Sequence, residues 1–206
     1  MNRFDESAKT WDTKPSSLAM AKACVENINK IIKLKDNAKI LDYGCGTGLV
    51  AFSLSNETNE VIGMDNSSGM VEQFNKKANE LNYSNIKAIK HDINDENLEE
   101  NEFDLIITSM SLHHIKNADI FIEKAYEALK KDGFLCINDL DKEDGTFHKK
   151  HNNEGVYHFG FDKNELENSL KNLGFKIIDY KIVYTDFRED REFPIFNLIA
   201  QKEGKK

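Results

Sequence analysis

The chain has 206 residues, of which 39% are hydrophobic and 31% are charged, and this balance is typical of a globular protein rather than a disordered one. Its formal net charge of −8, with lysines dispersed among acidic residues, argues against a nucleic-acid-binding protein, which usually carries a basic face. The three cysteines, Cys24, Cys45 and Cys136, form no CxxC pair, so neither a disulfide framework nor a zinc ribbon is expected.

The first residues are polar and lack the apolar region of a secretory signal. No segment reaches the roughly 20 apolar residues that a membrane helix needs. We therefore expect a cytoplasmic protein with no membrane partner. The sequence leaves its oligomeric state open.

Strand-like and helix-like segments alternate from the N-terminus onward. A helix is predicted after Pro15, with Ser16 or Ser17 as its N-cap and apolar residues at helical spacing as far as Ile32. Apolar runs predict strands over residues 38–43, 60–65, 86–89, 103–108 and 133–138. The segments between them predict helices over residues 49–54, from Asn66 or Ser67 to Leu81, and over residues 120–129.

The last third of the chain ends in a different pattern. Asp162, with Glu165 three residues later, is a capping-box signal for a helix that Gly174 ends. Two apolar segments follow, 175–184 and 193–201, and the polar turn between them indicates an antiparallel hairpin. The fold class is therefore α/β: a single-domain, Rossmann-like, seven-stranded and mostly parallel sheet with helices on both faces.

Within this single domain, spanning residues 1–206, four regions differ in character. Residues 1–35 hold an N-terminal segment and a helix, residues 38–140 the alternating core, and residues 161–206 the last helix and the hairpin. Residues 139–160 are long, rich in Gly, Asn and His, and without periodicity. A loop of that length in a compact domain is usually functional or mobile.

A glycine cluster, LDYGCGTG at residues 41–48, follows the first predicted strand. Ligands of open α/β sheets bind beyond the carboxyl ends of the strands, where glycines let the backbone approach them. Dinucleotide sites use G-x-G-x-x-G, but here the spacing is G-x-G-x-G and Leu49 stands where a third dinucleotide glycine would be. Asp42 precedes the first of these glycines, and a carboxylate there suits a ligand with a positively charged end better than a pyrophosphate.

Two more acids end predicted strands. Asp65 closes the second strand, where a carboxylate can accept both hydroxyls of a ribose. Asp92 follows the third strand, where it can accept from the exocyclic amine of an adenine.

Residues 38–140 resemble the core of class I S-adenosylmethionine (AdoMet)-dependent methyltransferases. LDYGCGTG resembles their motif I, VIGMDNSSGMVEQ their ribose-binding segment and KHDI their adenine-binding segment, while FDLIITSMSLHHI resembles the fourth-strand motif of the ubiquinone- and menaquinone-type branch. The turn before the fifth strand, LKKDGF at residues 129–134, departs from the Leu-Lys-Pro-Gly-Gly pattern but keeps its glycine.

The resemblance implies AdoMet as the cofactor, S-adenosylhomocysteine (AdoHcy) as its product, and a small-molecule acceptor. The implied cofactor-binding residues are Asp42, Gly44, Cys45, Gly46, Gly48, Asp65, Asn66, Met70, His91, Asp92, Ile93 and Ser109. A weaker resemblance links FDESAKTWD, at residues 4–12, to the N-terminal lid of several small-molecule methyltransferases.

The acceptor site is expected where the lid meets the loop of residues 139–160. Its candidate acceptor-binding residues are Phe4, Trp11, Tyr157, His158 and Phe159, and its candidate catalytic residues are His113, His114, Asp139 and His158. No metal ligand is assigned. His148, His151 and His158, with Asp139, Asp141 and Asp144, make a metal site conceivable, but their spacing matches no strong template and a polar covering loop is favoured.

Methyl transfer from a sulfonium is an in-line displacement with a neutral leaving group, so proximity and the exclusion of water can supply most of the acceleration. A base is needed only where the acceptor must lose a proton. Two alternatives remain: a catalytically silent methyltransferase-like binding or interaction protein, and a nicotinamide-dependent oxidoreductase, against which the glycine spacing argues.

Overall fold

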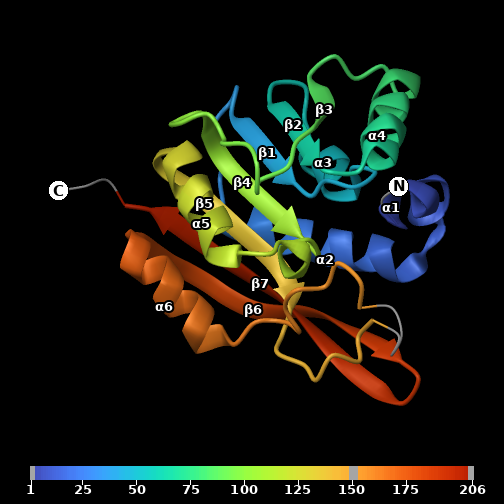
Figure 1. The fold of residues 1–206 in the computed structure, drawn as a ribbon. Coiled ribbons are helices and arrows are strands. Elements are labelled where there is room, and N and C mark those ends of the chain that lie inside the picture. The colour runs from blue at the N-terminus through green and yellow to red at the C-terminus, as the bar shows by residue number, and fades with distance from the viewer. Residues whose placement is uncertain (1–2, 149–152, 204–206) are drawn as a thin grey trace.

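The computed structural model of the chain describes residues 3–148 and 153–203, with one seven-stranded sheet in the order β3-β2-β1-β4-β5-β7-β6 (Figure 1). Strands β1 to β5 run parallel, and β7 is antiparallel to both of its neighbours, β5 and β6. The predicted mostly parallel sheet with a C-terminal antiparallel hairpin is confirmed. The strands are β1 (Lys39–Tyr43), β2 (Glu60–Asp65), β3 (Ile86–Lys90), β4 (Phe103–Ser109), β5 (Leu129–Leu140), β6 (Phe175–Arg188) and β7 (Arg191–Lys202).

Helices cover both faces of the sheet. On one face, α2, α3 and α4 bury their apolar side chains in one cluster, and on the other, α5 and α6 share a second cluster with the opposite side chains of the strands. The helices are α1 (Arg3–Ser7), α2 (Pro15–Ile31), α3 (Leu49–Leu54), α4 (Ser68–Glu80), α5 (Ala118–Ala128) and α6 (Lys163–Leu173), with 3-10 turns η1 (Ala8–Thr13) and η2 (Leu112–His114).

The central strands carry runs of apolar residues because both of their faces are buried. In β1, Ile40 packs under α2 and α3, whereas the next residue, Leu41, packs in the cluster of α5 and α6. Ile107 and Ile106 divide in the same way in β4, and all four side chains are fully buried. This explains why the sequence shows continuous apolar runs there rather than alternation.

The helix ends follow the predicted caps with one exception. The side chain of Asp162 accepts from two backbone N–H groups at the start of α6, and Gly174 ends that helix with a left-handed φ of 102°. Ser67, one of the two candidates, caps α4 by accepting from the backbone of the first turn. The predicted serine cap of α2 is wrong, because Pro15 occupies the first helical position and Lys14 precedes it without a side-chain cap bond.

The N-terminal segment, residues 3–13, lies against α4, on the opposite side of the molecule from α6 (Figure 1). It consists of α1 and η1, which then turn into α2. The opening residues therefore form a helical cover over the end of α4 nearest the glycine loop.

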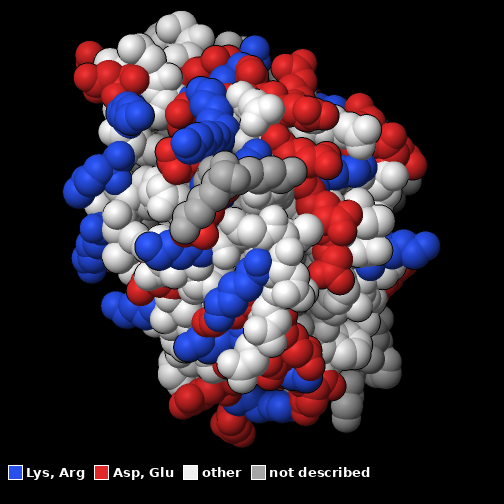
Figure 2. Space-filling model, turned by 90° about the vertical axis from the view of Figure 1, so that its left-hand side faces the viewer, with Lys and Arg blue, Asp and Glu red and all other residues white. Residues whose placement is uncertain are grey.

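None of the helices in the described parts of the chain is long and apolar enough to cross a membrane. Figure 2 shows the face that lies on the left in Figure 1, where lysine and arginine side chains lie among acidic ones. On that face the charges of both signs are interspersed, as the dispersed lysines of the sequence predict.

Candidate functional site

The loop between β1 and α3 turns sharply at the carboxyl edge of the sheet. Gly44, Gly46 and Gly48 have left-handed φ angles of 70°, 52° and 88°. A second constraint acts at Gly44, because a Cβ there would lie 1.8 Å from Oγ of Ser111, which follows β4. Only glycine meets both requirements, so the loop backbone and Ser111 approach each other closely at this edge.

Asp42 lies at the end of β1 and is almost completely buried. Its Oδ2 accepts a hydrogen bond from the backbone N–H of Ala51, 3.1 Å away in α3. The pKa of Asp42 is raised to about 7, mainly by burial and also by the negative charge of Asp65, while the hydrogen bond from the Ala51 N–H lowers it. The carboxyl group is thus buried in the protein, and it gains or loses its proton near neutral pH.

Asp65, at the end of β2, ties two parts of the predicted cofactor site together. Its Oδ2 accepts from the backbone N–H of Gly46 at 2.9 Å, and its Oδ1 accepts from the N–H of Ser67 at 2.8 Å. Burial raises its pKa, although these two hydrogen bonds lower it and the nearby Asp5 raises it. Each oxygen has a further lone pair, so the carboxylate can also accept from two hydroxyls.

The neighbours of these acids have different environments. Met70 is buried beside the loop, where a Cβ on Gly46 would lie 3.9 Å from its sulfur. The thiol of Cys45 instead packs against β2 in the hydrophobic core, and burial raises its pKa. Asn66 is exposed. Cys24 and Cys136 are buried free thiols, as expected of small apolar residues.

The segment after β3 is organised by Tyr43, which the sequence analysis did not single out. The Tyr43 hydroxyl accepts from the backbone N–H of Ile93 at 2.8 Å and lies 3.3 Å from Nδ1 of the buried His91. Asp92 is half-buried, and its Oδ1 accepts from the backbone and side-chain nitrogens of Asn94. His91 therefore fixes the loop through its protein contacts, while Asp92 stays nearer the surface.

At the end of β4, Ser109 is half-buried, and its Oγ accepts from the side-chain amide of Asn138 in β5 at 3.0 Å. The two residues are partners in the register of these parallel strands. Ser109 thus lies at the same sheet edge as the glycine loop, as its assignment to the cofactor site requires.

Two aspartates fasten the N-terminal segment over this edge. Oδ1 of Asp5 accepts from Oγ of Ser67 at 2.6 Å and from the N–H of Gly69 at 2.9 Å, at the start of α4. Asp12 accepts from the hydroxyl of Thr47 in the glycine loop and from Lys77. The segment is therefore anchored on both sides of the predicted cofactor site.

The aromatic side chains of the N-terminal segment extend from this anchor toward η2. The ring of Phe4 meets that of Trp11 edge-on at 6.2 Å and that of His114 edge-on at 5.1 Å. Trp11 is half-buried, with Nζ of Lys14 4.0 Å from its ring centre. Phe4 is thus the member of the segment that reaches the candidate catalytic histidines.

His113 and Asp139 form a buried pair between η2 and the end of β5. Nδ1 of His113 lies 2.6 Å from Oδ1 of Asp139, and the two side chains are 1% and 0% exposed. Burial alone would raise the pKa of Asp139, but His113 and the backbone N–H groups around the carboxylate hold it below its usual value. The carboxylate is therefore ionised and accepts the Nδ1 proton of His113.

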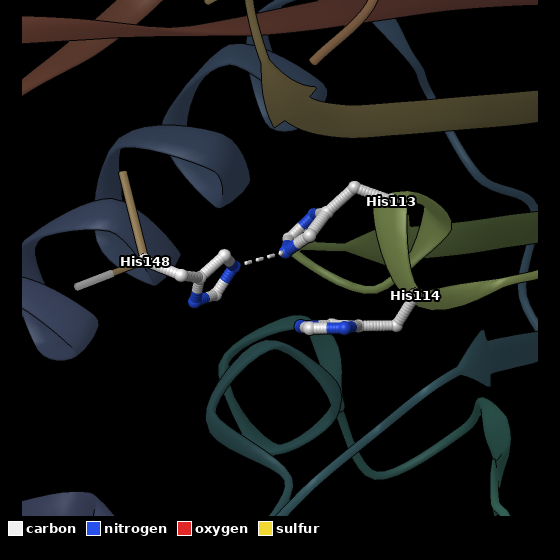
Figure 3. Close-up of side chains that lie close together, drawn as sticks. All are labelled: His113, His114 and His148. Carbon is white, nitrogen blue, oxygen red and sulfur yellow. Dashed lines mark hydrogen bonds between the residues drawn. The ribbon is translucent and has the colours of Figure 1, made fainter. Parts of the chain in front are cut away.

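The loop after β5 brings a third histidine to this pair. Nε2 of His148 lies 3.2 Å from Nε2 of His113, and the ring of His114 lies close to both and is tilted against each (Figure 3). His113 and His114 come from η2, whereas His148 comes from the loop 35 residues away. The sequence pairs His113 with His114 and groups His148 with the other loop histidines, and it does not predict that the three meet.

The other loop candidates lie outside that histidine group. Nε2 of His158 is 2.9 Å from the carbonyl oxygen of Ile115, and its ring packs against Phe161. Tyr157 and Phe159 are exposed by 54% and 45%. The loop is nevertheless fixed to η2, because the N–H groups of Tyr157 and His158 both donate to the carbonyl oxygen of His113.

Of the acids in the conceivable metal set, Asp139 bonds to His113, whereas Asp141 and Asp144 have other partners. Oδ1 of Asp144 accepts from Thr146, its Oδ2 accepts from Arg191, and Oδ1 of Asp141 accepts from the N–H of Lys142. His151 lies outside the described residues.

The strand order, the antiparallel β7, the glycine turn after β1 and the acid at the end of β2 together define the methyltransferase sheet of the Rossmann-like class. The family whose model is described as "Methyltransferase domain" matches residues 34–190, and the chain belongs to this family. By fold and family the chain belongs to the class I AdoMet-dependent methyltransferases, as the motifs of residues 38–140 predict.

Among its relatives is an uncharacterized methyltransferase of Schizosaccharomyces pombe, which is 34% identical over 159 residues, covering 71% of this chain and 56% of the relative. A ubiquinone biosynthesis O-methyltransferase of Pelagibacter ubique is 31% identical over 125 residues, covering 57% of this chain and 50% of the relative. The chain thus spans about half the length of these two relatives. An AdoMet-dependent methyltransferase structure from Aquifex aeolicus has the same fold, with a TM-score of 0.72 and 23% identity over 96% of this chain and 98% of that one.

Proposed function

We propose that the chain transfers the methyl group of AdoMet to a small-molecule acceptor that binds between the N-terminal segment and the histidine group. The observation that carries this proposal is that three separate parts of the chain meet at one place. Phe4 of the N-terminal segment lies against His114 of η2, and His148 of the loop lies against His113. All of them lie beside the carboxyl edge of the sheet, where α/β proteins bind ligands.

The residues at that edge fit AdoMet. Asp65 offers two oxygens to the ribose hydroxyls, and the left-handed glycines of the loop let its backbone approach a ligand closely. Asp42 lies behind the loop and would be charged more readily beside the ammonium end of the methionine part. Asp92, after β3, would accept from the adenine amine. The relative from Pelagibacter ubique is named as an O-methyltransferase, which favours a hydroxyl acceptor.

AdoMet supplies an activated methyl group on a sulfonium, so the protein has to hold the acceptor in line and keep water out. Phe4 and Trp11 provide apolar surface for this, fastened by Asp5 and Asp12. Such covers often move during turnover, and here four hydrogen bonds to α4 and the glycine loop hold the cover in place.

Of the four candidate catalytic residues, three lie together. His113, oriented by Asp139, and His114 face the proposed acceptor position, whereas His158 is bonded to a backbone carbonyl. An acceptor that must lose a proton would therefore lose it at the His113 and His114 end of the site. An acceptor that carries no such proton needs only to be positioned there.

The experiment is a methyl-transfer assay with labelled AdoMet and a panel of hydroxyl, amine, thiol and carbon acceptors. We expect acceptor-dependent formation of AdoHcy by the full chain, with hydroxyl acceptors the best class. Phe4→Ala should lower the rate at least about tenfold while leaving AdoHcy affinity nearly unchanged, because a lost positioning contact acts on the acceptor.

Thr10→Ala is the matched control, since Thr10 is exposed in the same segment and its hydroxyl donates only within that segment. It should leave both the rate and AdoHcy binding unchanged. If no acceptor of the panel is methylated although AdoHcy binds, the proposed activity is wrong. If Phe4→Ala methylates at the full rate, the acceptor enters elsewhere.

A further inference from the structure

We propose that His113, His114 and His148 form a three-histidine site for a divalent transition-metal ion, with Zn²⁺ as the preferred metal. One ring nitrogen from each residue lies within 4.8 Å of the other two. Figure 3 shows the three rings turned toward a common point from two separate parts of the chain. The proposal goes beyond methyl transfer, and it replaces our expectation from the sequence, which assigned no metal ligand.

The spacing of the two best-placed nitrogens fits a metal. In a tetrahedral zinc site with zinc–nitrogen distances of about 2.0–2.1 Å, the ligand nitrogens are about 3.3 Å apart. Nε2 of His113 and Nε2 of His148 are 3.2 Å apart. In the metal-free arrangement a proton bridges these two nitrogens, and a bound ion would take its place between the two lone pairs.

The hydrogen bonds behind the rings prepare them to bind an ion. Nδ1 of His113 donates to the buried carboxylate of Asp139 at 2.6 Å. Nδ1 of His114 lies 2.6 Å from the carbonyl oxygen of Gly155, and because a carbonyl only accepts, this nitrogen carries the proton. In its neutral form each ring therefore carries its lone pair on Nε2, as metal-binding histidines with carboxylate or carbonyl partners do.

The surroundings favour an ion that prefers nitrogen ligands. The ring centre of Phe147 lies 5.0 Å from that of His148 and 6.5 Å from that of His113. The ring of Phe4 covers His114. Within the described ranges, no carboxylate or thiolate joins the three histidines as a fourth ligand. Three imidazoles suit Zn²⁺, Co²⁺ or Ni²⁺ and not Mg²⁺ or Ca²⁺, which prefer oxygen ligands.

A site with three protein ligands keeps a position open for another ligand. The three histidines lie near the region where we place the acceptor, because η2 follows Ser111, which lies against the glycine loop at Gly44. A heteroatom of the acceptor could occupy the open position and be held in line by the ion. This consequence rests on the proposed function, whereas metal binding itself does not.

The test uses the full chain, stripped of metal with a chelator and without AdoMet or acceptor. Co²⁺ is titrated while the visible absorption is recorded, and Zn²⁺ is titrated against a chromophoric chelator. We expect one ion per chain, with the intense Co²⁺ absorption of four- or five-coordination. His148→Ala should weaken Zn²⁺ binding at least about 100-fold, since removing a ligand costs more than removing a ligand's partner, and Asp139→Asn should weaken it by about 10- to 100-fold.

His158→Ala is the matched control, because this histidine lies in the same loop but bonds to the carbonyl oxygen of Ile115. It should bind Zn²⁺ like the parent protein, and circular dichroism should show that each variant is folded. His114→Ala provides a second ligand variant should His148→Ala fail to fold. No stoichiometric binding, or equal binding by the ligand variants and the control, would overturn the proposal, whereas a failure of methyl transfer alone would concern only the proposed activity.

Discussion

The buried carboxyl group of Asp42 should make the stability of the protein depend on pH in a defined way. Its pKa is raised from 3.8 to about 7, mainly by burial, so the native state holds this proton more tightly than the unfolded chain does. The contribution of Asp42 to the free energy of unfolding is therefore complete below about pH 4 and is lost as the pH rises through about 7. The difference of about three pKa units corresponds to roughly 4 kcal/mol.

Asp42→Asn isolates this contribution from every other titrating group. The amide oxygen can still accept from the backbone N–H of Ala51, and it carries no charge at any pH. We expect the variant and the parent to be similarly stable at about pH 4, and the variant to be more stable by up to roughly 4 kcal/mol at about pH 8. Asp36→Asn, which changes an exposed acid, should not show this pattern.

The assay is urea unfolding followed by circular dichroism at both pH values, with the difference in free energy between parent and variant as the readout. A difference that does not change with pH would refute the reasoning. So would a variant that becomes less stable than the parent as the pH rises.

Three further predictions concern the cofactor edge and its cover. Asp65→Ala should weaken AdoHcy binding by about 2–4 kcal/mol in calorimetry, because it removes two charge-assisted acceptors, and an unchanged affinity in a folded variant would show that the ribose binds elsewhere. Gly44→Ala should destabilise the protein by several kcal/mol and abolish AdoHcy binding, because the new Cβ would meet Ser111. Gly155 has a similar φ and no atom within 4 Å of such a Cβ, so Gly155→Ala should cost only about 1 kcal/mol of stability. Deleting residues 1–12 should abolish methyl transfer and only partly weaken AdoHcy binding, and methylation at the full rate by the folded truncated chain would disprove the cover.

The sheet and the cofactor edge could be predicted because they depend on local patterns. Runs such as residues 103–108 are apolar since both faces of the sheet are covered, and Asp65 is recognisable because it ends such a run. The predicted start of α2 was wrong because the helix begins at Pro15, before the two serines. The fixed φ of Pro15 suits the first helical position. The α5 helix begins at Ala118, two residues earlier than predicted, because Asn117 caps it.

The contacts that define the proposed acceptor site depend on the tertiary fold. No sequence spacing connects His113 with His148. The loop that carries His148 has no periodicity that would predict where it packs against the rest of the fold. Asp5 and Asp12 likewise look like ordinary surface acids until α1 and η1 place them against α4 and Thr47. Tyr43 had a usable signal, as the one aromatic residue of β1 and the last residue of that strand.

The most direct test of the account is a crystal structure of the chain with AdoHcy bound. We predict that the Asp65 carboxylate accepts from both ribose hydroxyls, that the adenine lies beside Asp92, and that the sulfur faces the group formed by His113, His114 and His148. A complex in which the ribose contacts other residues, with the sulfur directed away from the histidines, would contradict the placement of both the cofactor and the acceptor.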